Sequence, residues 1–237
     1  MGRAPLKIGI ALVFVVIMGV TGVLADTSPG ADIQQRVARM AADRHVRLLD
    51  PSELPAALVD ALVATEDERF WQDHGVDVIG MTRALTYDAT HACACEGGST
   101  ITQQLVKLVY LNGTNWGWNK IRGIALAFKV ELLISKRQIL ADYFSIVTFG
   151  YGLYGADAAA CAYFGSHLDR LDLAQDALLA GMPQAPAAYD PRVHPGATRA
   201  RRSVVLRAMV DGGYITRSEA RAAGAAPVIT APLPAGC

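Results

Sequence analysis

The feature that most restricts the fold of this 237-residue chain is a series of apolar stripes with helical spacing. In the first stripe, Leu58, Leu62 and Val63 recur at the interval of one helix face, after Ser52 as an N-cap and Pro55 in the first turn. Further helical patterns, separated by short segments that carry Gly or Asn, cover residues 78–90, 100–110, 121–133, 136–144 and 173–180. No stretch alternates as a half-buried strand does. The sequence therefore predicts a mainly α-helical domain over about residues 51–225, followed by a tail at 226–237.

The amino-terminal segment predicts export or membrane attachment. Arg3 and Lys7 precede an uncharged run over residues 8–25, and Asp26 follows it. This arrangement fits both a cleaved signal peptide and a single membrane anchor, so residues 1–25 are predicted to be one or the other. Residues 26–50 are polar and helix-permissive, which is typical of a stalk between such a leader and a folded domain.

Charge and cysteine content narrow the classes of partner. The chain has 22 basic and 22 acidic side chains, without the basic excess that a nucleic-acid-binding protein needs. The four cysteines, Cys93, Cys95, Cys161 and Cys237, lack the paired spacing of a zinc site. Export would permit a disulfide, whose pairing the sequence does not determine. Residues 199–222 are predicted to form a basic helix and then a short helix after Thr216; the basic side chains are interpreted as a solvated face, with a membrane-surface role as the alternative.

An acidic block follows the first apolar stripe. Glu66, Asp67 and Glu68 lie together, and Glu66 comes four residues after Leu62, at the edge of the buried face. A carboxylate that is partly desolvated beside other carboxylates can act as a general base near neutral pH. The alternative interpretation is an acidic helix end with Arg69 as its ion-pair partner.

A second block joins a glycine pair to the start of a helix. Residues 97–107 read Gly-Gly-Ser-Thr-Ile-Thr-Gln-Gln-Leu-Val-Lys. The free N–H groups and the dipole at a helix start favour an anion. Ser99, Gln104 and Lys107 can offer hydroxyl, amide and ammonium donors to one oxygen-rich ligand. The alternative is an ordinary capped helix with an exposed lysine.

Together these blocks resemble glycosyltransferase family 51, the peptidoglycan polymerases. The first block resembles the family's Glu-Asp-x-x-Phe…Gly-x-Asp motif, and the second matches its Gly-Gly-Ser-Thr-Ile-Thr-Gln-Gln motif up to Gln104. Further segments resemble the family in its order and spacing: Ser135-Lys136, Ile139-Leu140, Tyr143, Phe149-Gly150, Tyr154-Gly155, Tyr163-Phe164-Gly165, residues 178–186 and Tyr189-Asp190-Pro191. The resemblance covers about residues 54–215.

The resemblance implies a lysozyme-like helical domain that polymerises lipid-linked disaccharide-pentapeptide (lipid II) into glycan strands and releases undecaprenyl pyrophosphate. It implies Glu66 as the general base. It also implies substrate contacts from Asp67, Phe70, Ser99, Thr100, Gln103, Gln104, Lys107, Lys120 and Arg122. No cofactor is required, although a divalent cation such as magnesium or manganese assists some members. The expected partners are lipid II, the nascent strand, the inner membrane and other wall-synthesis proteins, with the catalytic domain on the periplasmic side.

The third family block departs from the pattern. The family's second glutamate falls at Gly123, and family arginines fall at Asn115 and Asn119. The first block has Asp73 where a histidine is usual, and Ser145 replaces an expected asparagine. Since a glycine cannot help to neutralise a leaving pyrophosphate, the alternative function is a catalytically impaired relative that binds lipid-linked glycan as a scaffold or regulator. A lysozyme-like hydrolase is a third interpretation, which the missing carboxylate does not favour.

Overall fold

The computed structural model describes residues 18–19, 21–91, 98–114 and 116–228. The leader prediction falls largely on residues 1–17, outside this range, as do Asn115 and the cysteines at 93, 95 and 237. Within the described residues, no helix combines the length and apolarity needed to span a bilayer.

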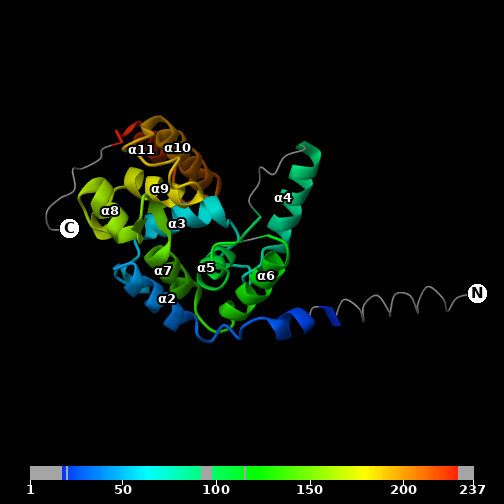
Figure 1. Ribbon diagram of the computed structural model, residues 1–237. Coiled ribbons are helices and arrows are strands. Elements are labelled where there is room, and N and C mark those ends of the chain that lie inside the picture. The colour runs from blue at the N-terminus through cyan, green and yellow to red at the C-terminus, as the bar shows by residue number, and fades with distance from the viewer. Residues whose placement is uncertain (1–17, 20, 92–97, 115, 229–237) are drawn as a thin grey trace, which may run out of the picture.

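The mainly helical fold predicted from the sequence is confirmed (Figure 1). The helices are α2 (Ile33–Asp43), α3 (Ala56–Glu66), α4 (Val78–His91), α5 (Ile101–Tyr110), α6 (Trp118–Glu131), α7 (Lys136–Ile146), α8 (Ala156–Phe164), α9 (Leu173–Gly181), α10 (Pro195–Asp211) and α11 (Arg217–Ala225). Three short 3₁₀ helices occupy Pro51–Glu53, Leu168–Arg170 and Met182–Gln184. The sequence did not predict α8, whose alanine-rich face carries no clear apolar stripe.

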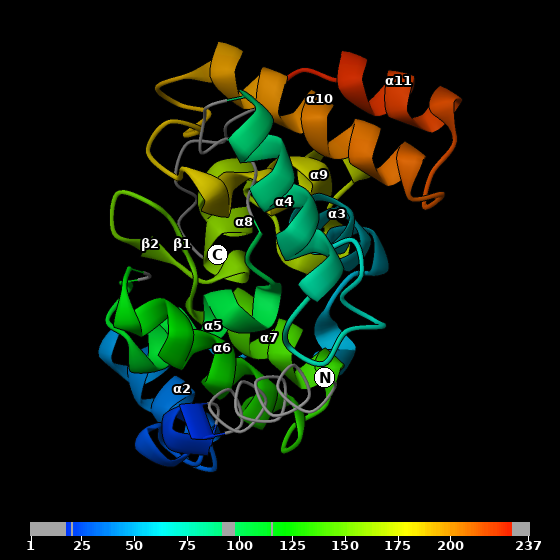
Figure 2. The same ribbon diagram turned by 90° about the vertical axis from the view of Figure 1, so that its right-hand side faces the viewer.

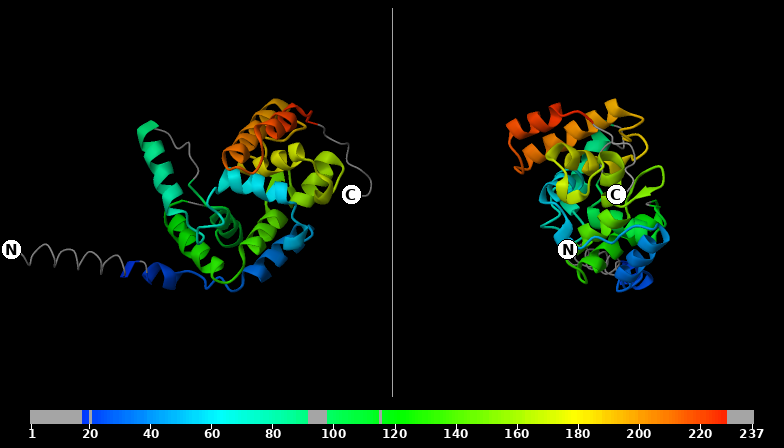
Figure 3. Two further views of the ribbon diagram at one scale, coloured as in Figure 1. Left: turned by 180° about the vertical axis from the view of Figure 1, so that it is seen from behind. Right: turned by 90° about the vertical axis from the view of Figure 1, so that its left-hand side faces the viewer.

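The helices form two groups around one continuous apolar core (Figures 1 and 2). In one group α3 packs against α9 and α10, and α11 packs against α10; in the other α5 packs against α6 and α7, and α2 against α7. Helix α8 contacts both α7 and α9 and so joins the groups. Helix α4 extends away from the body on the side opposite α8, as the view from behind in Figure 3 also shows.

A short antiparallel hairpin joins α7 to α8. Strand β1 (Thr148–Gly150) pairs with β2 (Leu153–Tyr154). The turn places Tyr151 and Gly152 at φ angles of 45° and 78°, which suits a tight hairpin whose two central residues are both left-handed. The pairing is too short to appear as alternation in the sequence.

The segment predicted to be a stalk is part of the folded domain. In α2, Ile33, Val37 and Ala41 recur at intervals of four residues and are almost fully buried in the common core. The Tyr110 hydroxyl donates to the Asp32 carboxylate at 2.7 Å, which ties the start of α2 to the end of α5. The domain therefore begins near residue 33 rather than at 51, because this polar segment carries one narrow apolar stripe that the core buries.

The start of α3 also differs from the prediction. Asp50, not Ser52, is the cap: its side chain accepts from the Ser52 N–H at 2.9 Å, and Glu53 accepts from the Asp50 N–H at 2.7 Å. This reciprocal pair stabilises the 3₁₀ helix at residues 51–53. Helix α3 itself begins after Pro55, which lies in the N-cap position with an extended backbone.

Candidate active site

The candidate site lies where α3 ends against α5 and α10. Five buried apolar residues of α3 fix its orientation in the core, and Glu66 is its last residue. The Glu66 carboxylate accepts from the Arg201 Nη2 of α10 at 2.7 Å and from the Gln104 Nε2 of α5 at 3.1 Å. The Glu66 side chain keeps 16 % exposure and that of Arg201 keeps 10 %. A carboxylate from the end of one helix is thus held by donors from two others.

Arg201 is itself fixed by a second bond. Its Nε donates to the Gly181 carbonyl at 3.0 Å, at the end of α9. A Cβ on Gly181 would lie 3.0 Å from both the Cγ of Arg201 and a methyl of Val205, so glycine allows α9 and α10 to approach this closely. The guanidinium therefore reaches Glu66 in one orientation. Sequence reasoning assigned this arginine to a solvated basic face and missed it.

Gln104 is oriented from its other side by Tyr143. The buried Tyr143 hydroxyl donates to the Gln104 Oε1 at 2.9 Å, which leaves the Gln104 amide NH₂ to donate to Glu66. Burial, and then the negative charge of Glu66, raises the pKa of Tyr143 far above its usual value, so the phenol remains a donor. Two of the four acceptor positions of the Glu66 carboxylate are used in this way.

The remaining side of Glu66 faces a small cavity of about 30 Å³. Its lining comes from the end of α3, the start of α4 and the glycine pair: Glu66, Asp67, Glu68, Asp77, Gly80, Met81, Arg83, Gly98, Ser99 and Thr100. The structure thus brings Glu66, Asp67, Ser99 and Thr100 to one cavity and Gln104 into contact with Glu66, while their roles toward a substrate stay predictions. Arg69 forms an ion pair with Asp77 at 3.2 Å, whereas Glu66 pairs with Arg201.

The start of α5 is already occupied by a side-chain carboxyl group. Asp67 accepts from the Ile101 N–H at 2.9 Å, and the Thr100 hydroxyl accepts from the Gln103 N–H at 3.1 Å. Thr100 also donates to the Gly75 carbonyl, and a Cβ on Gly75 would come within 2.6 Å of the Ala127 carbonyl oxygen. An anion was expected to bind the free N–H groups at this helix start. The N–H groups of Ile101 and Gln103 instead donate to side chains of the protein.

Several predicted substrate-binding residues are buried instead. Phe70 is fully buried beneath the ammonium of Lys136, and Asp67, Thr100 and Gln103 are each less than a tenth exposed. Asp67 and Thr100 still contribute to the lining of the cavity, whereas Phe70 and Gln103 lie outside that lining. Ser99 and Gln104 line or border the cavity, and Lys107 follows Gln104 by almost one helical turn, half-buried on α5.

A charged network lies behind Asp67. Lys136 pairs with Asp73 at 2.6 Å and with Glu131 at 2.7 Å, and Thr102 donates to Glu131 at 2.6 Å. Burial, and next the negative charge of Asp73, raises the pKa of Asp67 well above its usual range, although the Ile101 N–H opposes this shift. Asp73, at the position where a histidine was expected, thus belongs to an ion-pair network with Lys136 and Glu131. This network lies next to Asp67, beneath the candidate site.

The third family block lies apart from Glu66. Lys120 is exposed near the start of α6, and the Arg122 Nε lies 3.7 Å from an Asp26 oxygen. Gly123 is buried, and an added Cβ would lie 3.3 Å from the end of the Leu111 side chain. In the described part of the chain, no group of three or more His, Cys, Asp or Glu is arranged to hold a metal ion.

The model of the transglycosylase family matches residues 33–210. Penicillin-binding protein 1A of Vibrio cholerae is 41 % identical over 177 residues, which are 75 % of this chain and 22 % of that protein. Penicillin-binding protein 1A of Escherichia coli is 41 % identical over 167 residues, 70 % of this chain and 20 % of the relative. The chain thus spans about a fifth of the length of these relatives.

Among solved structures, penicillin-binding protein 1A from Haemophilus influenzae aligns with 25 % identity and a TM-score of 0.49. The alignment covers 78 % of this chain and 18 % of that one.

Proposed function

The chain belongs to the transglycosylase family, and from this premise we propose that it is a peptidoglycan glycosyltransferase that polymerises lipid II into glycan strands. The observation that carries the proposal is the Glu66 carboxylate, held by Arg201 and Gln104 at the edge of a cavity. A general base needs a fixed carboxylate with unused acceptor positions that face the substrate. Glu66 meets this requirement, and the chain belongs to the transglycosylase family.

In the proposed reaction, Glu66 takes the proton of the acceptor sugar's hydroxyl group. The oxygen of that group then attacks the anomeric carbon of the donor, a new glycosidic bond forms, and the bond to the pyrophosphate oxygen breaks. The products are the extended strand and undecaprenyl pyrophosphate. Arg201 and Gln104 act as positioning residues for the base, while Ser99 and Lys107 are the nearest candidates to bind the leaving pyrophosphate.

The exposed apolar side chains favour a lipid-linked substrate and contact with a membrane surface. Four large apolar side chains are exposed on the surface of the domain: Val78 and Ile79 on α4, and Ile121 and Phe128 on α6. Trp116, Trp118, Leu132 and Leu133 extend this set at both ends of α6. Large exposed apolar patches mark contacts with membranes, lipids or other proteins. We propose that the domain works on the periplasmic face of the inner membrane, beside other wall-synthesis proteins.

A specific observation supports a second candidate function, an impaired relative that binds lipid-linked glycan without polymerising it. Gly123 supplies no side chain, and Arg122 points toward Asp26. The third block thus offers Lys120 as its exposed cation among the described residues 118–123. Losing one electrostatic contributor to a transition state typically costs about 10²- to 10³-fold in rate. The enzyme would then be slow, or would serve as a scaffold or regulator.

The deciding experiment is polymerisation of purified lipid II by the full chain in detergent. We expect a ladder of glycan products from the unaltered protein and none from Glu66→Gln, which should still bind lipid II. Asp169→Asn is the control, because Asp169 is an exposed carboxylate that pairs with Arg170 and does not line the cavity. Turnover retained in Glu66→Gln would refute Glu66 as the base. Binding without any product from the unaltered protein would establish the non-catalytic candidate.

A further inference from the structure

Three buried carboxyl groups beneath the candidate site share one cation. Lys136 pairs with Asp73 and Glu131, and the third group, Asp67, lies beside Asp73. The side chains of Asp73 and Glu131 are 2 % and 5 % exposed, and Asp67 is 6 % exposed. If all three carboxyl groups were ionised, one ammonium would face three negative charges away from water, which is costly. Charge balance therefore favours a proton on one of them.

The hydrogen bonds of the two aspartates indicate where that proton lies. Asp73 Oδ1 accepts from Lys136 Nζ at 2.6 Å and from the Gly75 N–H at 3.2 Å. The buried Asp73 Oδ2 has no donor among the described residues. Asp67 Oδ2 accepts from the Ile101 N–H at 2.9 Å, and the Asp67 and Asp73 carboxyl groups lie within hydrogen-bonding distance of each other. A proton on Asp67 supplies the donor that Asp73 Oδ2 lacks.

The other charged groups around this pair are already matched. They come from α3, α4 and the segment between these helices: Glu66, Glu68, Arg69, Asp77 and Arg83. The two arginines among them, together with Arg201, each pair with one of the three carboxylates. His74 follows Asp73 in the chain and is exposed. Asp67 forms no ion pair with any of the described residues, so its charge would be unmatched.

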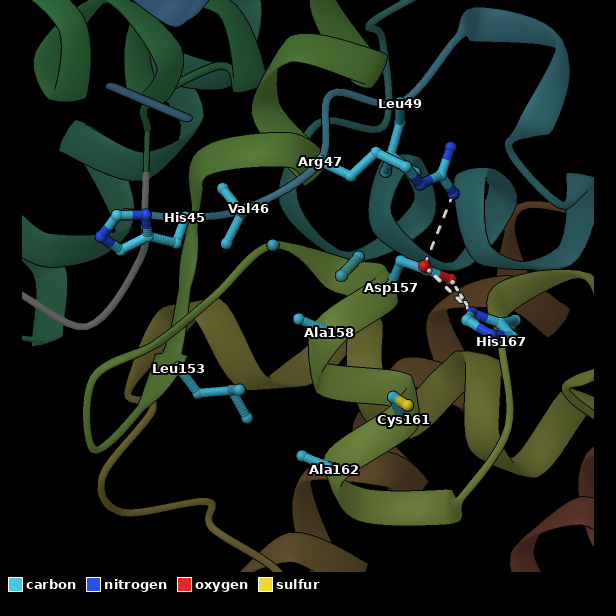
Figure 4. A pocket seen from close by; sticks show the side chains of 12 residues that line it. His45, Val46, Arg47, Leu49, Leu153, Asp157, Ala158, Cys161, Ala162 and His167 are labelled. Atoms are coloured by element: carbon cyan, nitrogen blue, oxygen red, sulfur yellow. Dashed lines mark hydrogen bonds and ion pairs between the residues drawn. The ribbon is translucent and has the colours of Figure 1, made fainter. Parts of the chain in front are cut away.

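Two ionised aspartates elsewhere in the fold show the contrasting arrangement. Asp157 lies between Arg47 and His167 at the edge of a groove of about 320 Å³ beside α8, and both its oxygens have partners (Figure 4). Asp190 likewise accepts at both oxygens, at 2.8 and 2.9 Å, from the arginine two residues further on. Burial alone would raise the pKa of each carboxyl group, yet these donors hold it below its ordinary value. Asp73 lacks a donor at one buried oxygen.

We propose that Asp67 and Asp73 share one proton near neutral pH, with Asp67 as its carrier, and that Asp73 is a positioning residue of the site. The proton of Asp67 bonds to Asp73, at the position where the family resemblance implies a histidine. The other Asp67 oxygen bonds the start of α5 through Ile101, and α5 carries Gln104, which donates to Glu66. The pair thus supports one of the two donors that hold the base.

The shared proton also keeps Asp67 neutral at the edge of the cavity. Glu66, Glu68 and Asp77 already line that cavity. Under the proposed function it receives a substrate with a pyrophosphate group, which a further carboxylate would repel. The sharing of the proton stands without the proposed function, whereas its effect on the substrate rests on it.

Asparagine at either position separates a shared proton from two ordinary carboxylates. In Asp67→Asn, the amide NH₂ can donate to Asp73, and in Asp73→Asn it can donate to an ionised Asp67. Each variant keeps both the hydrogen bond and the net charge of the cluster at neutral pH, so both should fold. Neither keeps the proton.

Urea-induced unfolding of the full chain between about pH 5.5 and 7, where unfolded carboxyl groups are ionised, counts that proton. The folded pair retains a proton that the unfolded chain releases, so stability falls as pH rises. The unfolding constant should rise about tenfold more per pH unit in the unaltered protein than in either variant. The double variant should match the single ones, because only one proton is lost. Asp176, whose pKa is also raised by burial, is present in every protein and cancels.

The control for these slopes is Asp190→Asn, because Asp190 is a buried aspartate that is already ionised. Its slope over this pH range should equal that of the unaltered protein. Equal slopes in the unaltered protein and Asp67→Asn, or a proton that persists in Asp73→Asn, would overturn the proposal.

Infrared spectroscopy detects the proton without unfolding. With isotope-labelled aspartate, the folded protein near neutral pH should show the carbonyl band of a protonated carboxylic acid. This band should weaken in Asp67→Asn and in Asp73→Asn, and it should stay unchanged in Asp190→Asn. A band of equal strength in the unaltered protein and both pair variants would refute the shared proton.

Polymerisation kinetics test the effect on the site separately. As the pH rises above neutrality and the pair loses its proton, KM for lipid II should rise several-fold in the unaltered protein and less in Asp67→Asn. An equal rise in both proteins would overturn the effect on the substrate. Absence of any polymerisation would contradict the proposed function, while the unfolding slopes and the infrared band would still decide whether the proton is shared.

Discussion

Replacing Arg201 with methionine should remove the ion pair that holds the Glu66 carboxylate in place. Methionine keeps much of the apolar stem that packs near Gly181 and Val205, but it removes the bonds to Glu66 at 2.7 Å and to the Gly181 carbonyl at 3.0 Å. Breaking a buried ion pair by removing one partner typically costs about 3–5 kcal/mol. The two side chains keep 10 % and 16 % exposure, so water compensates in part. We therefore expect a loss of about 2–3 kcal/mol in the free energy of unfolding.

A double-mutant cycle with Glu66→Gln isolates the ion pair from other effects. If Arg201 acts on Glu66, the double variant should be less destabilised than the sum of the single variants, by about 1–2 kcal/mol. The measurement is urea-induced unfolding followed by circular dichroism, with the thermal midpoint as a second readout. Arg199→Met is the matched control, because Arg199 lies on the same helix with an exposed side chain. Strict additivity of Arg201→Met and Glu66→Gln would refute the coupling.

The same substitution should slow polymerisation. A base displaced by about 1 Å can lose roughly 10²-fold in rate, so we expect Arg201→Met to lower kcat by about that factor with a smaller change in KM. Arg201→Lys should be intermediate, because one ammonium cannot reproduce the fork that contacts both Glu66 and Gly181. Full activity in Arg201→Met, at a temperature where the variant is folded, would remove Arg201 from the positioning of the base.

Four further predictions concern other parts of the fold. Gly123→Ala should raise the free energy of unfolding by about 0.5–1 kcal/mol in urea, because the added Cβ meets only the flexible end of Leu111; a loss would show that Leu111 cannot shift. Gly123→Glu should raise polymerisation if the site is attenuated, and no gain would indicate that α6 has been rebuilt around glycine. Burial, and next the charge of Asp172, raises the pKa of Asp176 from its ordinary value of 3.8 to about 7, so the folded state keeps a proton that the unfolded chain has released. Stability should therefore fall as pH rises from about 4 to 7, and less steeply in Asp176→Asn; parallel pH profiles would contradict this. Lys129→Met should speed hydrogen exchange over residues 24–30, because the Lys129 ammonium donates to the carbonyls of residues 24, 27 and 28; unchanged exchange would refute that clamp.

The sequence determined the features that depend on neighbouring residues. Helix boundaries for α4, α5, α7 and α9 agree with the predicted ones to within two residues, because apolar spacing and capping act over one or two turns. The family was also determined by sequence, since its motifs are contiguous blocks in a set order. Glu66 was predicted to lie at the edge of a buried face, and its side chain is largely but not fully buried.

Tertiary structure decided which groups meet Glu66 and which positions are available to a ligand. Arg201 lies 135 residues along the chain from Glu66 and reaches it only because α10 packs against α3 beside a glycine. The start of α5 looked like an anion site from its own residues, yet Asp67 from another segment bonds it. Residues 33–43 looked like a stalk because their single apolar stripe gains stability only when α7 covers it. Local patterns encode a helix and its faces, whereas the partner of each face depends on how distant segments pack.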